Sequence, residues 1–126
     1  MTLSSMTPAI ILFAHGSRDP LWHKPIEAVA RAIEQREPGA TVRCAYLELS
    51  TPGLPEAGAE LVAQGVKHVR VFPLFLGVGK HAREDLPLLM DELRAAHPSV
   101  QFDLLPTAGE APQLTALMAD LALGRT

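Results

Sequence analysis

The stretch IILFAHGSRDP, residues 10–20, decides how the rest of the chain is read. Together with Ala9 it holds an apolar run, AIILFA, that is typical of a strand buried on both faces. The run stops at a histidine, a glycine, a serine and an arginine, so polar groups follow the strand directly. Asp19-Pro20 then offers a helix cap with proline at the first helical position. The stretch predicts a strand over 9–14, a polar turn and a helix.

The same alternation continues along the chain. Further strands are expected over 41–47, 68–76 and 100–105, and Pro73 predicts a bulge or an early end of the third strand. Helices are expected from Pro20 to Pro38-Gly39, from Thr51-Pro52 to near Gly65, for about ten residues from Leu86, and over 112–122. This βαβαβαβα pattern predicts an α/β fold with a four-stranded parallel sheet, flavodoxin-like strand order 2-1-3-4, in three layers.

Composition narrows the class of protein. A chain of 126 residues is expected to form one domain over 1–126, with an ordered core over about 8–123. The net charge of −3 argues against nucleic-acid binding. The single cysteine, Cys44, excludes an internal disulfide and fits a reducing cytoplasm. No basic residue precedes Arg18 and the first apolar run is short, so neither a secretory leader nor a membrane span is expected.

Candidate ligands follow three of the expected strands. His15 follows the first strand, Glu48 the second and His81 the third. Ligands of open parallel sheets bind beyond the carboxyl ends of the strands, where the strand order reverses. With strands about 4.8 Å apart, the three side chains could reach one centre. Two imidazoles and a carboxylate suit a divalent first-row metal, although each residue alone is equally compatible with an ordinary solvated loop.

Three cations flank these histidines: Arg18, Lys80 and Arg83. In a chain that is acidic overall, such a local cluster predicts a receptor for an anionic substrate. Ordinary charges at helix ends and in loops are the alternative explanation. The other histidines, His23, His68 and His97, are interpreted as structural or exposed.

Three motifs together resemble a known family. ILFAHGSRDP, AYLELSTPGLPEA and VFPLFLGVGKHAREDLP are similar to the class II chelatases of the sirohydrochlorin type. The similarity is to the short, single-half cobaltochelatases of cobalamin biosynthesis and to their ferrochelatase relatives, which act in siroheme-type biosynthesis. It runs from about residue 8 to the final helix. The resemblance implies a metal chelatase that inserts a divalent metal, as substrate, into a tetrapyrrole rich in carboxylates. It implies no organic cofactor.

The resemblance also implies roles for particular residues. His15 and His81 correspond to the metal-binding histidines of the family, and Glu48 to its supporting glutamate. A histidine would also accept the pyrrole protons, a role that suits an imidazole with its ordinary pKa near 6.5. Contact with substrate carboxylates is expected from Arg18, Lys80 and Arg83, joined by Ser17.

The resemblance further implies an assembly. Longer relatives carry two halves with the cleft between them, so this single half is expected to form a C2 homodimer. Candidates for the cleft wall or the dimer contact are Leu74, Phe75, Leu76 and Val78, which could equally be core.

Several alternatives stay open. Co²⁺ is the expected metal, with Fe²⁺ or Ni²⁺ as alternatives, and a carrier of metal or tetrapyrrole without turnover has the same ligands. A histidine phosphatase would need an arginine before His15, where this chain has Ala14. A nucleotide-binding flavodoxin-like protein would need a glycine-rich phosphate loop after the first strand, which the sequence lacks.

Overall fold

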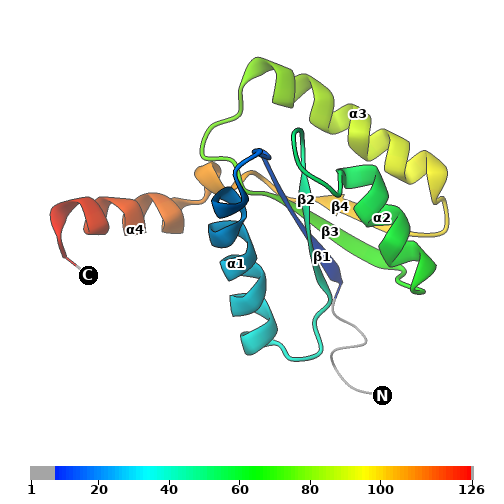
Figure 1. Cartoon of the computed structure of the whole chain (residues 1–126), viewed down its shortest axis with the longest axis horizontal. Coiled ribbons are helices and arrows are strands. Elements are labelled where there is room, and N and C mark those ends of the chain that lie inside the picture. Colours follow the sequence, from blue (N-terminus) through cyan, green and yellow to red (C-terminus); the bar gives the residue numbers. More distant parts are fainter. Residues whose placement is uncertain (1–7, 126) are drawn as a thin grey trace.

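The computed structural model describes residues 8–125 and contains one four-stranded parallel sheet in the order β2-β1-β3-β4 (Figure 1). Its strands are β1 (Ala9–Ala14), β2 (Val42–Tyr46), β3 (His68–Pro73) and β4 (Gln101–Leu104). The register aligns Leu12 of β1 with Cys44 of β2 and Phe72 of β3. The predicted fold class and strand order are confirmed. The single domain expected over 1–126, and the fraying expected for its first residues, extend beyond the described residues.

Helices lie on both faces of this sheet. α1 (His23–Arg36) packs on β1 and β2 from one face, while α2 (Leu54–Ala63) and α3 (Lys80–Ala96) cover the other (Figure 1). α4 (Pro112–Leu123) extends away from the sheet at the left of the view. Two short 3-10 helices, η2 (Pro20–Trp22) and η3 (Ala108–Glu110), precede α1 and α4. None of the helices within residues 8–125 has the length and apolar character needed to cross a bilayer.

The core lies between the sheet and the α2–α3 layer. Ile11 and Phe13 of β1 and Val69 and Val71 of β3 point into it and are almost completely buried. They meet the apolar faces of α2 and α3, which contribute Leu54, Leu61, Met90 and Leu93. Alternate residues on the strands point to the other face, where α1 covers Leu12. Burial of one such side chain contributes about 1.5–3 kcal/mol to the free energy of folding. The alternation of apolar residues therefore decides which face of each strand points into the core.

The third strand ends at Pro73, the residue from which an early end was predicted. Pro73 is the last residue of β3 and pairs with Phe13 of β1. Proline has no N–H to donate, and the Leu74 amide supplies the next bond, to the Phe13 carbonyl at 2.7 Å. The strand expected over 68–76 therefore stops three residues early. Residues 74–79 form the connection to α3.

The prediction for the third helix was wrong at its start. The helix begins at Lys80 after Gly79 and not at Leu86, so Pro87 lies inside it and not in its first turn. Proline is most frequent in first turns, and that preference favoured the late start. Ala82, Leu86 and Met90 instead contact the core at helical spacing, which continues the helix toward its N-terminus. Lys80, His81 and Arg83 consequently lie on the first turn of α3.

The second helix also begins later than expected. It starts at Leu54, after Gly53, and Thr51-Pro52 precedes it. The Pro52 carbonyl accepts a hydrogen bond from the Tyr46 amide at 2.9 Å, so this segment lies along the end of β2. At Asp19-Pro20 the expected cap is present, and Asp19 Oδ1 accepts the Leu21 amide at 2.9 Å. The element that it caps is η2, which leads into α1.

Candidate active site at the carboxyl edge of the sheet

His15 and Glu48 lie together at the carboxyl ends of β1 and β2. His15 Nδ1 is 3.0 Å from Glu48 Oε1, and both side chains are about half exposed, at 47% and 46%. A carboxylate can only accept in this contact, so Nδ1 carries the proton and donates it. Nε2 is then left with its lone pair. A histidine that donates one ring N–H to a carboxylate is the usual arrangement of a metal-binding imidazole, because the contact fixes the tautomer and makes the other nitrogen more basic.

The turn that carries His15 is held by close packing at Gly16. A Cβ on Gly16 would lie 1.8 Å from the Glu48 carbonyl oxygen and 2.8 Å from Ser50 Oγ. Only a residue without a side chain allows the two loops to approach so closely. The Gly16 amide also points at Glu48 Oε2, at 3.4 Å. The close approach of the two loops that Gly16 allows therefore places His15 beside Glu48.

Aromatic residues fix the other sides of His15. The rings of His15 and Phe75 lie 4.6 Å apart between centroids. The indole N–H of Trp22 donates to the His15 carbonyl at 2.7 Å. Phe75 comes from the segment after β3 and is buried, whereas Trp22 in η2 is exposed. The imidazole is thus contacted by Glu48 and Phe75, Trp22 holds the backbone of the same residue, and the His15 side chain is still about half exposed.

A hydrogen-bond network behind the turn involves His23, whose part the sequence did not reveal. The Ser17 amide donates to Ser50 Oγ at 3.0 Å, and the Ser50 hydroxyl donates to the Ser17 carbonyl at 2.8 Å. Since the single hydroxyl proton is used there, His23 Nε2, 2.9 Å from Ser50 Oγ, must be the donor in its contact. The His23 ring stacks on Tyr46 with centroids 4.6 Å apart. No motif marks this link between residues 27 positions apart in sequence.

Two titratable groups of β2, Cys44 and Tyr46, have raised pKa values. Burial raises the pKa of the Cys44 thiol, and the charges of Glu27 and Glu34 add to this effect. The thiol therefore stays protonated at neutral pH. Burial likewise raises the pKa of the Tyr46 phenol. Tyr46 acts as a neutral stacking partner for His23.

The remaining candidate residues lie around this centre. His81, Lys80 and Arg83 are exposed on the first turn of α3, and Arg18 is exposed in the turn after β1. Ser17 is half-buried and bonded to Ser50. Across residues 8–125, no three His, Cys, Asp or Glu side chains lie close enough together to form a metal-binding group. The structure thus joins His15 to Glu48 and leaves His81 apart from them.

The comparison with protein families gives one match that spans almost all of the described chain, CbiX over residues 9–123. The chain belongs to the CbiX family. The resemblance read from the HGSR and FPLFLGVGKH motifs is thereby confirmed. Among sequence relatives, the sirohydrochlorin cobaltochelatase of Methanosarcina acetivorans is 34% identical over 119 residues, which are 92% of each chain.

Other sequence relatives match over a shorter part of this chain. The sirohydrochlorin cobaltochelatase of Methanopyrus kandleri is 33% identical over 82 residues, which are 65% of this chain and 57% of that protein. The chain therefore spans little more than half the length of this relative.

Solved structures support the CbiX fold. A putative cobalamin biosynthesis CbiX protein from Marinobacter aquaeolei is 33% identical, with a TM-score of 0.80 over 95% of this chain and all of that one. The sirohydrochlorin chelatase SirB from Bacillus subtilis, solved with cobalt, is 24% identical and has a TM-score of 0.76. The match covers 93% of this chain and 50% of the SirB chain. It shows that the two proteins share a fold.

Proposed function

We propose that this CbiX-family protein inserts a divalent metal, Co²⁺, into sirohydrochlorin in the cytoplasm, as a lyase of cobalamin-type biosynthesis. The observation that carries the proposal is His15, half exposed at the switch point of the sheet and backed by Glu48 at 3.0 Å. The name of the Methanosarcina acetivorans relative supplies the substrate class, and the name of the Marinobacter aquaeolei protein supplies the biosynthetic context. The metal and the tetrapyrrole are both substrates, and the reaction needs no organic cofactor.

The reaction releases two pyrrole protons for each metal that enters the macrocycle. His15 Nε2, with Nδ1–H held by Glu48, can bind the incoming metal, and once the metal has left it the same nitrogen can take up one of the two pyrrole protons, while the other passes to solvent water. The charge of Glu48 stabilises the imidazolium that forms. We infer that Glu48 acts on the metal through His15, since its Oε1 contacts Nδ1 and its Oε2 lies toward the Gly16 amide.

The surroundings of His15 suit a flat apolar ring edged with carboxylates. Leu21, Trp22, Leu49 and Leu76, which belong to the loops around His15, are large apolar residues with exposed fractions of 47–65%. Exposed apolar groups gathered at one place are typical of a binding surface. Arg18, Lys80 and Arg83 would then meet the carboxylates, together with Ser17. The proposed homodimer would close the site from the other side, with Leu76 and Val78 at the cleft wall.

We propose His81 as the second ligand of the incoming metal, and replacing it with alanine is expected to lower metal insertion by roughly 10²-fold. The physical reason is that a single imidazole holds a divalent ion weakly, and α3 carries His81 on an exposed first turn that can approach the macrocycle. The measurement is kcat/KM for Co²⁺ insertion. Unchanged kcat/KM would remove His81 from the site and leave His15 as its only histidine.

Replacing Arg83 with glutamate is expected to raise KM for the tetrapyrrole about tenfold while changing kcat little. The change replaces an attractive contact with repulsion of a substrate carboxylate and leaves the reacting centre intact. Glu84→Arg, the inverse change at the next exposed position of α3, serves as the charge control. Equal KM values for Arg83→Glu and the unaltered protein would contradict contact between Arg83 and the substrate.

The proposal is tested by absorbance spectroscopy of the purified protein with sirohydrochlorin, offering Co²⁺, Fe²⁺ and Ni²⁺ in turn. Multiple turnovers with Co²⁺ are expected, at a rate well above spontaneous insertion. Faster turnover with Fe²⁺ or Ni²⁺ would assign that ion, in place of Co²⁺, as the metal substrate. The assay has to decide because affinity order alone does not select among these ions. Binding of metal or tetrapyrrole without accelerated insertion would identify a carrier and overturn the enzymatic proposal.

A further inference from the structure

Leu49 has a backbone conformation that leucine rarely adopts. Its φ is +64°, and within residues 8–125 every other positive φ belongs to a glycine. The Ser50 amide donates to the Glu48 carbonyl at 2.8 Å, so Leu49 is the central residue of a tight turn closed by a bond between residues i and i+2. At such a φ the Cβ of an L-residue comes too close to a backbone carbonyl oxygen, a cost that glycine avoids and asparagine tolerates.

Fixed neighbours impose this conformation on Leu49. On one side, the Glu48 carbonyl oxygen is packed against Gly16, where a Cβ would lie only 1.8 Å away. On the other side, the Ser50 hydroxyl donates to the Ser17 carbonyl at 2.8 Å, and the Ser17 amide donates back to Ser50 Oγ at 3.0 Å. Backbone strain persists only where the surrounding structure holds it in this way. Leu49 therefore cannot relax unless the turn after β1 moves too.

Burial does not offset the strain at Leu49. The side chain is 60% exposed, whereas Leu47, two residues earlier in the same loop, packs against the core. Glycine or asparagine would suit the backbone at position 49 better than leucine. Strain of this kind is concentrated at binding and catalytic sites, where it serves a contact with a ligand. The leucine side chain at position 49 is therefore explained by something outside the folded chain.

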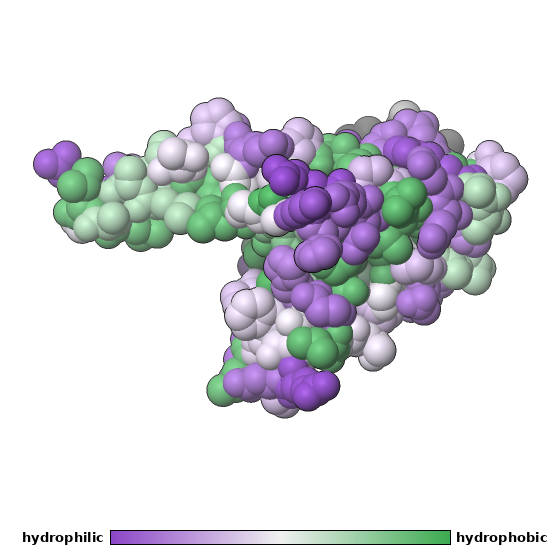
Figure 2. All heavy atoms as spheres, turned by 90° about the horizontal axis from the view of Figure 1, so that it is seen from above, coloured by the Kyte–Doolittle hydropathy of each residue, from purple (hydrophilic) through white to green (hydrophobic). Residues whose placement is uncertain are grey.

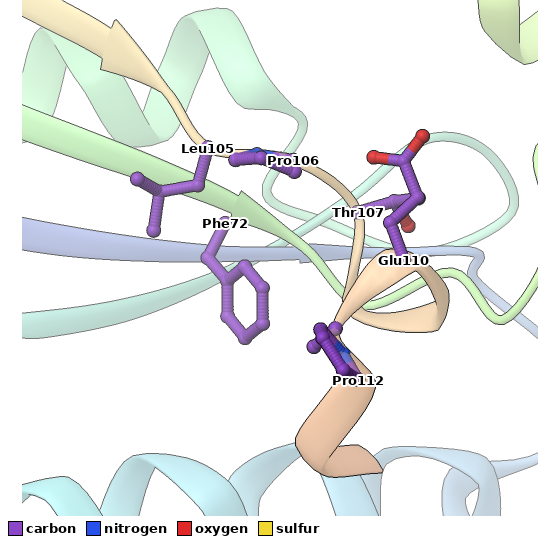
Figure 3. Close-up of a pocket in the computed structure, with 7 residues that line it drawn as sticks. Phe72, Leu105, Pro106, Thr107, Glu110 and Pro112 are labelled. Carbon is purple, nitrogen blue, oxygen red and sulfur yellow. The ribbon is translucent and has the colours of Figure 1, made fainter. Parts of the chain in front are cut away.

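Other exposed apolar groups of the protein lie on regular elements. Figure 2 shows a largely apolar surface along α4, which includes Leu117 and Leu121 at 51% and 57% exposed. Phe72 of β3 lines an apolar hollow (Figure 3). Exposure of these side chains follows from the periodicity of a helix or a strand and requires no unusual backbone. Leu49 differs from them because its exposure comes with a strained turn.

The strained turn belongs to the candidate active site. Leu49 directly follows Glu48, whose carboxylate accepts from His15 Nδ1 at 3.0 Å. The exposed Trp22 is joined to the same site through its indole bond to the His15 carbonyl at 2.7 Å. The turn thus presents an apolar side chain one residue away from the group that orients the imidazole.

We propose that Leu49 is a substrate-binding residue that contacts the apolar face of the tetrapyrrole, and that the strained turn is retained for this contact. The inference rests on the proposed function and adds to it the residue whose conformation is costly without a ligand. The conjugated core of a tetrapyrrole is flat and apolar, with its carboxylates at the periphery. Contact with that core removes the leucine side chain from water, which favours binding. Better stability of the free protein is thereby exchanged for affinity.

The decisive variant is Leu49→Asn. Asparagine has nearly the shape of leucine and adopts a positive φ more readily, but it replaces the apolar surface with an amide. The melting temperature is expected to rise by about 2–4 °C, because the turn is relieved of strain. The Kd for metal-free sirohydrochlorin is expected to rise about tenfold, because the apolar contact is lost.

Both quantities are measured without metal and without turnover. Thermal unfolding gives the melting temperature. Binding is followed by quenching of the emission of Trp22, the single tryptophan of the chain, because a bound tetrapyrrole absorbs the light that the indole emits.

Two further variants separate the apolar contact from the strain. Leu49→Met keeps an apolar side chain at the strained position, so its Kd and melting temperature should stay close to those of the unaltered protein. Val29→Asn makes a similar exchange of apolar surface for an amide in the middle of α1, where the backbone is helical. It should leave Kd unchanged and should not raise the melting temperature.

The outcomes distinguish this inference from the proposed function. Equal Kd values for Leu49→Asn and the unaltered protein would overturn the inference and leave the proposed function intact. Absence of tetrapyrrole binding by the unaltered protein would contradict both. A lower melting temperature of Leu49→Asn would show that the leucine stabilises the fold, and a changed molar mass by light scattering would assign it to a contact between chains. Either result would overturn the inference.

Discussion

Replacement of His15 by alanine is expected to reduce kcat/KM for metal insertion by about 10³-fold, within the range that loss of a positioned general base produces. The side chain both presents Nε2 to the metal and receives a pyrrole proton, and nothing else at the carboxyl ends of β1 and β2 offers a basic nitrogen with a carboxylate on its far side. The measurement is the initial rate of the spectral change with sirohydrochlorin and Co²⁺.

Two further variants make this result specific. His97→Ala removes an imidazole at the end of α3, far along the chain from the site, and should leave kcat/KM unchanged. Glu48→Gln keeps the size of the side chain and removes its charge. Glu48→Gln should lower kcat/KM about 10–100-fold, as expected for the loss of a group that orients a metal-binding histidine. A His15→Ala protein that retains full activity would show that the metal enters elsewhere.

Replacement of Gly16 by alanine is expected to reduce kcat/KM by about 10²-fold, because displacement of a reacting group by 1 Å can cost that much. The added methyl would lie 1.8 Å from the Glu48 carbonyl oxygen. This carbonyl is backbone and cannot rotate away as a side chain would, so the turn after β1 must move and carry His15 with it. Overpacking of this kind should also lower the free energy of unfolding by about 1–3 kcal/mol.

Gly77→Ala is the matched control for the steric effect. A Cβ on Gly77 would meet nothing within 4 Å, so the melting temperature of this variant should stay close to that of the unaltered protein. Thermal unfolding and kcat/KM are measured for both variants. Gly16→Ala with unchanged kcat/KM and melting temperature would show that the turn after β1 can shift without disturbing His15.

Much of the fold could be predicted because its signals are local. The apolar run over 9–14 and the alternation that follows it lead to β2-β1-β3-β4, since right-handed crossovers leave few other arrangements. The start of α3 was missed because Pro87 favoured a late start, while contacts of Ala82 with the core favoured an early one. Such contacts form only when the helix is docked on the sheet.

The site was predictable in part. His15 and Glu48 follow adjacent strands, so their convergence follows from the strand order. The bond from Glu48 to Nδ1 and the Ser50 link to His23 depend on side-chain rotamers, which the sequence does not reveal. The position of α4 was beyond prediction for another reason. An apolar stripe at 114, 117, 118 and 121 looks the same in sequence whether the helix packs on the sheet or extends away from it.

Phe75 occupies a particular place in this architecture. Its ring lies against His15, and its carbonyl accepts the hydrogen bonds that anchor the root of α4. The ring and the backbone of one residue thus act at two places in the fold, because the ring contact is specific to Phe75 whereas any residue would supply the carbonyl. A substitution that moves the backbone at position 75 is therefore expected to displace both the imidazole of His15 and the 3-10 helix η3 that leads into α4.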